Sequence, residues 1–215
     1  MRASCACITI LLFCLQAGAQ PTSEPGERQT YSYLGLQANQ LINQLFNSGA
    51  TVANPYLLTY SINDRLRGTG FTTGIGYTYN QTREGDAFSS VNVHTSDLSL
   101  RLGLEKKMFI AQRWLWSIGG DVVIRKLKET STGANPSTSF VTEESKTSEA
   151  GFGPRCTINF AIADRIIVGT EASVYMKFGS EIHTITGTSV PPQSPRRYHS
   201  FVPAIPSVIY LIVRF

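Results

Sequence analysis

The residues best suited to nucleophilic chemistry lie in VHTSD, residues 93–97. His94 and Ser96 are two positions apart, so on a β-strand both side chains point to the same face. A serine nucleophile needs a histidine within hydrogen-bond reach and an acid that orients the histidine. By the expected topology the nearest acids are Glu84 and Glu129, and neither is placed clearly on that face. The pair can therefore also be interpreted as a polar strand tip without activity.

The remaining histidines, cysteines and acids do not have the spacing of a catalytic or metal site. His183 and His199 are too scattered to complete a zinc site with Cys156, which falls on an apolar strand face as an inert small hydrophobe. The acids that could suggest calcium lack the spacing of a calcium loop; they are Asp86, Glu143, Glu144 and Glu149. We therefore expect no enzyme, no cofactor and no metal.

The first 19 residues have the order of a secretory signal peptide. Arg2 precedes an apolar stretch from Ile8 to Leu15, and the small residues Ala17-Gly18-Ala19 follow as a cleavage site. Residues 20–30 read as a flexible polar leader, and 31–215 as one domain. Three of the four cysteines leave with the signal, so no internal disulfide is possible. Removing Arg2 from the formal +4 leaves +3, which is too mild to indicate nucleic acid.

The dominant hydrophobic period after the leader is two, which predicts β-strands. The apolar stretches run for about 9–11 residues, the length with which a tilted strand crosses a bilayer. Residues 33–46 also suit a short helix, but we interpret them as a strand. The eight expected strands are 33–46, 56–62, 71–80, 96–106, 114–126, 149–162, 166–178 and 199–215.

The expected connections alternate in size. Long or polar loops are predicted at 47–53, 81–90, 130–144 and 179–198, and short turns at 64–69, 107–112 and 162–165. Short turns on one side and long loops on the other are typical of an outer-membrane barrel. Because proline removes a ladder donor, Pro154 and Pro206 predict bulges.

The two faces of each expected strand differ in content. One face carries large apolar residues, and the other carries Gly, Ser, Thr and isolated charges. This pattern suits a barrel with lipid outside and a lumen filled by ion pairs, although a solvated surface could look similar. A turn centred on Ala163 would place Arg155 opposite Glu171. The charges expected in the lumen polar network are Asp97, Arg101, Glu105, Asp121, Arg125, Glu149, Arg155, Glu171, Lys177 and Arg214.

Aromatic residues are expected to ring the barrel in two girdles, as in membrane barrels. The girdle at the short-turn end would contain Phe71, Trp114, Trp116 and Phe160. The girdle at the long-loop end would contain Tyr56, Tyr77, Tyr79 and Phe178.

The chain ends on SVIYLIVRF, residues 207–215, and here it resembles outer-membrane β-barrel proteins of Gram-negative bacteria. The whole looks like the small eight-stranded barrels of the OmpX and OmpA-transmembrane type. The stretch GLQANQLINQLFNSG…NPYLLTYSIND is similar to uncharacterised Bacteroidota barrels. The resemblance implies that Ile209, Leu211, Val213 and Phe215 form an assembly signal read by the barrel-insertion machinery.

The expected protein is thus an all-β, eight-stranded antiparallel up-and-down transmembrane β-barrel in the cell outer membrane. Its lumen would be closed, and its role structural or in surface contact, as a monomer surrounded by outer-membrane lipid and lipopolysaccharide. The arginines of SVPPQSPRR, residues 189–197, could touch lipopolysaccharide phosphates or simply be solvated. One alternative is a lipid hydrolase, because the Ser96/His94 pair resembles the arrangement in lipid A deacylases. The other is a secreted, lipocalin-like binder with the apolar face inside.

Overall fold

The computed structural model describes residues 30–38, 57–85, 90–135, 138–186, 194–204 and 208–215. These residues form one antiparallel sheet, and the fold class is all-β, as predicted. No helix in these ranges is long and apolar enough to cross a membrane. The strands are β1 (Thr30–Gln37), β2 (Leu58–Asp64), β3 (Thr69–Gly85), β4 (Ser90–Ala111), β5 (Trp114–Asn135), β6 (Thr138–Ala161), β7 (Ile166–Thr186), β8 (Arg196–Ala204) and β9 (Tyr210–Arg214).

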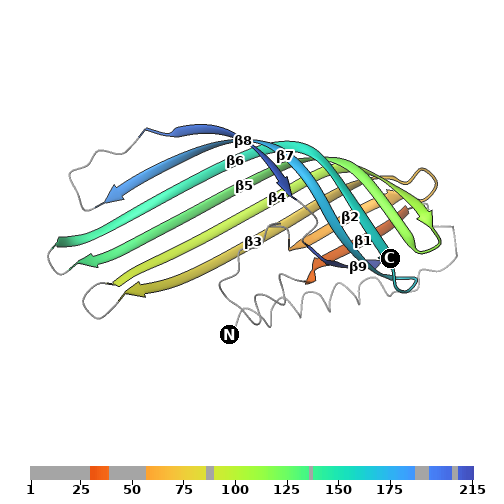
Figure 1. The fold of residues 1–215 in the computed structure, drawn as a ribbon, viewed down its shortest axis with the longest axis horizontal. Coiled ribbons are helices and arrows are strands. Elements are labelled where there is room, and N and C mark those ends of the chain that lie inside the picture. Colours follow the sequence, from red (N-terminus) through yellow and green to blue (C-terminus); the bar gives the residue numbers. More distant parts are fainter. Residues whose placement is uncertain (1–29, 39–56, 86–89, 136–137, 187–193, 205–207) are drawn as a thin grey trace.

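The sheet closes into a ring of eight strand positions (Figure 1). Each strand from β1 to β6 pairs with the strand that follows it in the sequence. The ring closes because β9 pairs with both β1 and β7. The strands β8 and β9 share one position, because β8 pairs with Ser173–Glu181 of β7 and β9 with Ile166–Gly169. The prediction of one continuous strand over 199–215 was therefore wrong, while the predicted ring of eight is confirmed. Pro206 and residues 39–46 of the first predicted strand lie outside the described residues.

Most of the predicted long loops are hairpin extensions of the strands. On the first hairpin, β3 continues to Gly85 and β4 begins at Ser90. On the next, β5 continues to Asn135 and β6 begins at Thr138. Similarly, β7 continues to Thr186. These segments are rich in Thr, Ser and Val, and their backbone groups pair across each hairpin. In Figure 1 the extensions reach well beyond β1, β2 and β9. The predicted loop 47–53 lies outside the described residues.

The connections at the other end are tight. The turn between β2 and β3 agrees with the prediction for 64–69, and Gly68 there has a φ of 66°, which favours glycine. The amide of Gly68 donates to the Asp64 carbonyl at 2.9 Å. The turn between β6 and β7 covers the predicted 162–165. The turn predicted at 107–112 is shorter, since β4 runs to Ala111.

Pro154 does not produce the predicted bulge. The pairs Phe152↔Met176 and Arg155↔Ser173 keep one register on either side of it, and β5 continues past it at Gly120↔Pro154. The ladder to β7 skips only Gly153 and Pro154. The missing donor therefore interrupts the pairing locally without inserting a residue.

Side chains alternate between a polar interior and an apolar exterior. On β4, Arg101 is 1 % exposed, whereas Leu100 and Leu102 are 40 % and 54 % exposed. The same alternation holds on β5, where Asp121 is buried and Val122 is exposed. This distribution is the reverse of a soluble protein, in which apolar residues fill the interior. It is also the reverse of a lipocalin-like barrel with an apolar inside.

Candidate functional site in the barrel lumen

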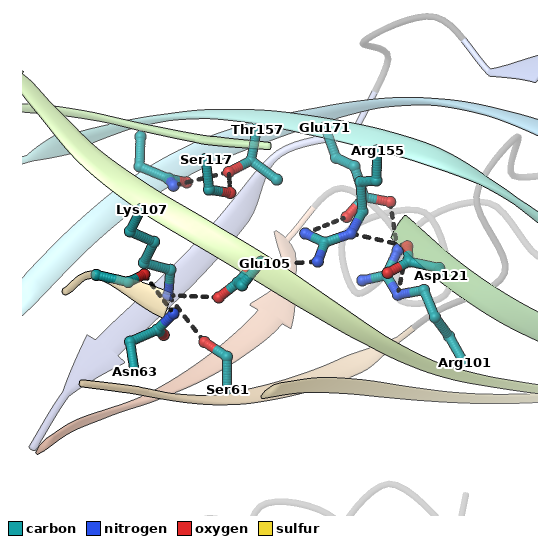
Figure 2. Close-up of polar contacts among 12 residues, drawn as sticks. Ser61, Asn63, Arg101, Glu105, Lys107, Ser117, Asp121, Arg155, Thr157 and Glu171 are labelled. Atoms are coloured by element: carbon teal, nitrogen blue, oxygen red, sulfur yellow. Dashed lines mark hydrogen bonds and ion pairs between the residues drawn. The ribbon is translucent and has the colours of Figure 1, made fainter. Parts of the chain in front are cut away.

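Six charged side chains meet in the lumen, and we call them the central cluster. Residues two apart on a strand point to the same face, so the inner faces of β4–β7 bring these groups together. The central cluster consists of Arg101, Glu105, Lys107, Asp121, Arg155 and Glu171 (Figure 2). Three are cations and three are anions, so the formal charges cancel. A balanced set is what a lumen largely shut off from water requires, because an unpaired buried charge is costly.

Arg155 occupies the middle of the central cluster (Figure 2). Its Nε donates to Asp121 Oδ2 at 2.8 Å, and its Nη2 donates to Glu105 Oε2 at 3.1 Å. Glu171 Oε2 lies 3.8 Å from Nη1. One guanidinium thus links carboxylates from β4, β5 and β7, using the planar fork of donors that only arginine provides.

Arg101 spans the lumen. Its Nη1 donates to Glu171 Oε1 at 2.5 Å, which joins β4 to β7, strands that are not neighbours in the ring. Its Nε lies 3.8 Å from Asp121 Oδ2, and the Tyr175 hydroxyl donates to the same carboxylate oxygen at 2.9 Å. The charges therefore link opposite walls as well as adjacent strands.

The predicted register, with Arg155 directly opposite Glu171, was wrong, although the two side chains still form an ion pair at 3.8 Å. The turn between β6 and β7 is centred one residue later than expected, so Arg155 faces Ser173 and Glu171 faces Thr157. The two charges are diagonal neighbours, and the closest cation to Glu171 is Arg101. Pairing patterns along adjacent strands could not reveal a partner on the far wall.

Sequence reasoning missed Lys107, which had been assigned to a turn. Its Nζ lies 3.1 Å from Glu105 Oε1, donates to Ser61 Oγ at 2.8 Å and sits 3.4 Å from the centre of the Tyr33 ring. The signal was available in its position: Lys107 lies two residues after Glu105 and six after Arg101, so on one strand all three side chains point to the same face. Sequence reasoning also missed Tyr175, although the period of two places it on the same face of β7 as Glu171 and Lys177.

A second group of charges lies nearer the hairpin extensions. Arg125 donates to Asp97 through Nε and Nη2, at 3.0 and 2.7 Å, and its Nη1 is 3.7 Å from Glu149. Glu149 also accepts from Lys177 at 3.3 Å and from the Tyr198 hydroxyl at 2.8 Å. The four predicted charges of this group form a chain of ion pairs in the order Asp97, Arg125, Glu149 and Lys177.

Arg214 is apart from both groups. Its guanidinium lies over the Tyr31 ring, 5.2 Å from the centre, at the tight-turn end. The Arg214 side chain is half-buried, and Arg214 lies opposite Tyr33 where β9 pairs with β1. Its contact is a cation–π interaction at the barrel mouth.

The space left in the lumen is small. A cavity of about 50 Å³ lies beside Arg101, Glu105, Lys107 and Tyr210. A cavity needs roughly 10–15 Å³ to hold one water, so this cavity has room for only a few waters. In the described part of the barrel, side chains fill the interior at the level of the central cluster.

His94 and Ser96 lie on the outer face of β4, opposite Gln81 and Tyr79 of β3. His94 Nδ1 is 3.2 Å from the Tyr79 hydroxyl. The acid next to the pair, Asp97, points inward and binds Arg125. Glu129 lies opposite Thr95, on the other face, and the side chain of Glu84 is outside the described residues. The hydrogen bond that His94 makes therefore joins it to a tyrosine and not to a carboxylate.

The aromatic residues named from the sequence lie in two bands. Trp114 and Phe160 pack at 4.9 Å between ring centres beside the tight turns, where Trp116 Nε1 donates to Cys156 Sγ at 2.6 Å. Phe71, also toward this end, is exposed. The exposed residues toward the extensions are Tyr77, Tyr79 and Phe178. Tyr56 is outside the described residues.

The C-terminal strand closes the ring. Ile209 and Leu211 are exposed. Leu211 and Val213 pair with Leu36 and Leu34 of β1, and the Phe215 amide donates to the Ser32 carbonyl at 2.9 Å.

Among the described residues, no group of three or more His, Cys, Asp or Glu is arranged to hold a metal.

A scan against protein-family models finds no match, and a search of curated proteins finds none either. Among solved structures, the chain is similar to a major outer membrane protein from Thermus thermophilus. That match has a TM-score of 0.50 and 10 % identity, and covers 86 % of this chain and 99 % of the other. Acinetobacter baumannii CarO is also found, with a TM-score of 0.38, 10 % identity, and coverage of 86 % and 95 %. The fold of this chain is therefore similar to that of a solved outer-membrane β-barrel.

Proposed function

We propose that this protein is an integral outer-membrane β-barrel with a closed lumen. The observation that carries the proposal is the inverted distribution of side chains. Leu104 is 70 % exposed and Phe201 is 69 % exposed, while Arg101 and Asp121 are almost completely buried. Soluble proteins rarely expose apolar surface in so continuous a band. A bilayer would cover this band and leave the paired charges inside.

The orientation follows from the two ends of the barrel. Thr30 faces Asp64 beside the β2–β3 turn, and the Arg214 amide donates to Arg165 in the β6–β7 turn. Both chain ends of the barrel thus lie with the tight turns, which face the periplasm in barrels of this kind. The hairpin extensions would then project from the cell.

The proposed role is structural or in surface contact and requires no catalysis. The central cluster blocks the lumen with ion pairs that join opposite walls, and the remaining cavity is about 50 Å³. The extended hairpins β3–β4, β5–β6 and β7–β8 offer the surface for contact. We further propose that the protein is a monomer of the small OmpX-like type from a Gram-negative bacterium. The barrel-insertion machinery would assemble it.

Fractionation, gel migration and conductance test this proposal. The full chain, expressed in a Gram-negative host, should fractionate with the outer membrane and show heat-modifiable migration after detergent extraction. Purified protein in planar bilayers should give no steady large conductance. Recovery in the detergent-free soluble fraction would refute the membrane assignment, and a steady large current would refute the closed lumen.

A further inference from the structure

Three lysines lie on the outer wall immediately beyond the apolar band, and we call them the lysine cluster: Lys126, Lys128 and Lys146. All three are exposed. On β5 the outward residues run from Val122 and Ile124, which are 56 % and 46 % exposed, directly into Lys126 and Lys128. Charges that follow an apolar band on the outer face lie where a bilayer's headgroups would meet the protein.

Two of these lysines are held together by an acid. Lys128 and Lys146 face each other across β5 and β6, a pairing of like charges that is unfavourable by itself. Glu144 lies between them, with its carboxylate oxygens 2.5 Å from Lys128 Nζ and 2.9 Å from Lys146 Nζ. Hydrogen bonds from Lys128, and then from Lys146, hold the pKa of the Glu144 carboxyl below its usual value. Together the three lysines of the cluster and Glu144 carry a net charge of +2.

Hydroxyl groups accompany the lysine cluster on the same face. Ser96 of β4 lies opposite Lys128, and Ser148 of β6 lies opposite Lys126. Ammonium and hydroxyl groups are the donors that phosphate oxygens accept from. Ser96 thus lies beside ammonium groups on a face that offers hydrogen-bond donors to a phosphate.

An open apolar groove of about 1070 Å³ lies on the same strands. Its floor includes Gly120, where an added Cβ would meet nothing within 4 Å. Gly120 stands between Leu104 and Pro154 in the register, so the outer wall lacks a side chain there. The apolar side chains around the groove are Phe71, Leu102, Leu104, Val122, Phe152 and Met176.

We propose that this wall binds a phosphorylated, multi-acylated glycolipid of the lipid A class, with an acyl chain in the groove and its phosphates on the lysine cluster. The charge of +2 is complementary to a headgroup with two phosphates, whereas an ordinary phosphodiester lipid carries one negative charge. Lys126 lies four residues after Val122 of the groove, which is about 13 Å along a β-strand. That distance fits within the roughly 15 Å of hydrocarbon in one leaflet. The inference rests on the proposed membrane location and outward-facing extensions.

A charge-matched pair of triple variants tests the phosphate contact. The first is Lys126→Gln/Lys128→Gln/Lys146→Gln. The control, Arg67→Gln/Lys106→Gln/Arg113→Gln, removes three cations at the tight-turn end. Native mass spectrometry of detergent-purified full chain would measure binding of lipid A with two phosphates, lipid A with one phosphate, and phosphatidylglycerol. We expect the lysine variant to lose lipid A affinity roughly tenfold or more, and the control to match the wild type.

A second pair of variants tests the groove. Gly120→Phe fills the floor, whereas Gly120→Ala adds one methyl group in open space. We expect Gly120→Phe to weaken binding of both forms of lipid A and Gly120→Ala to leave it unchanged. Heat-modifiable migration of each variant shows whether the barrel still folds.

Three outcomes would overturn the inference. In the first, the wild type retains phosphatidylglycerol as well as it retains lipid A. In the second, the lysine variant and its control lose lipid A affinity equally. In the third, a folded barrel binds no lipid A. Each of these leaves the proposed barrel function intact, because folding and outer-membrane fractionation are measured separately. A chain found in the soluble fraction would instead refute the proposed function itself.

Discussion

At the scale of single residues, the lumen shows why buried charges are tolerated here. Each cation of the central cluster contacts at least one carboxylate, and Arg155 contacts three. Removing one partner from such a set leaves a buried charge uncompensated, which costs more than the pair itself contributes. The central cluster therefore makes the barrel sensitive to any single loss of charge.

The substitution Glu171→Gln tests this. It keeps the shape of the side chain but leaves Arg101 without its closest carboxylate. We expect the free energy of unfolding to fall by about 3–5 kcal/mol. Urea unfolding of vesicle-inserted protein, followed by tryptophan fluorescence, measures the change. The control Glu143→Gln makes the same chemical change at an exposed position and should leave the unfolding midpoint in place. Equal midpoints for the two variants would contradict a stabilising role of the network.

At the scale of elements, the tight turns set the strand register. The β2–β3 turn depends on Asp64, whose Oδ1 accepts from the Leu66 and Arg67 amides at 2.8 and 2.7 Å. Gly68 ends the turn in a left-handed conformation and also accepts from the Lys107 amide at 2.8 Å. This turn thus holds β2, β3 and β4 together.

The substitution Gly68→Val should therefore destabilise the barrel. A β-branched residue at φ 66° is strained, and its Cβ would clash with the Lys107 carbonyl oxygen. We expect a loss of roughly 1–3 kcal/mol from backbone strain alone. Urea unfolding again measures it, with Gly120→Ala as the glycine control in open space. If both glycine variants unfold at the wild-type midpoint, the turn is not a constraint on the fold.

At the scale of the whole molecule, the exposed apolar band distinguishes a membrane barrel from a soluble one. In a soluble protein, replacing a half-exposed leucine by a charged residue changes stability by about 0.5 kcal/mol or less. In a bilayer the same change on the lipid face costs about 2–4 kcal/mol near the midplane. The stability of one surface variant therefore reports the surroundings of the entire barrel.

The substitution Leu102→Arg makes this comparison at a side chain that is 54 % exposed. We expect it to destabilise the vesicle-inserted barrel by about 2–4 kcal/mol, because arginine would face acyl chains. Ser148→Arg is the control, since it lies on the outer face beside the lysine cluster and should have little effect. Urea unfolding in vesicles compares the two. Wild-type stability of Leu102→Arg would argue against a lipid-facing wall.

The alternation of residue types determined much of this protein by itself. The period of two, the mixed charges on one face and the apolar residues on the other predicted an antiparallel barrel of eight strands. They also identified nearly all charges that lie in the lumen. The physical reason is that a strand sends successive side chains to opposite faces, so burial and exposure can be read directly from the order of residues.

Only the tertiary structure decided which groups meet across the lumen and where strands end. Arg101 and Glu171 are 70 positions apart on strands that do not pair, so ring closure alone brings them within 2.5 Å. Polarity made the segments over 130–144 resemble a loop, yet they are strands because each hairpin satisfies its backbone groups. The lysine cluster likewise arises from register, since Lys128 and Lys146 become neighbours only when β5 pairs with β6.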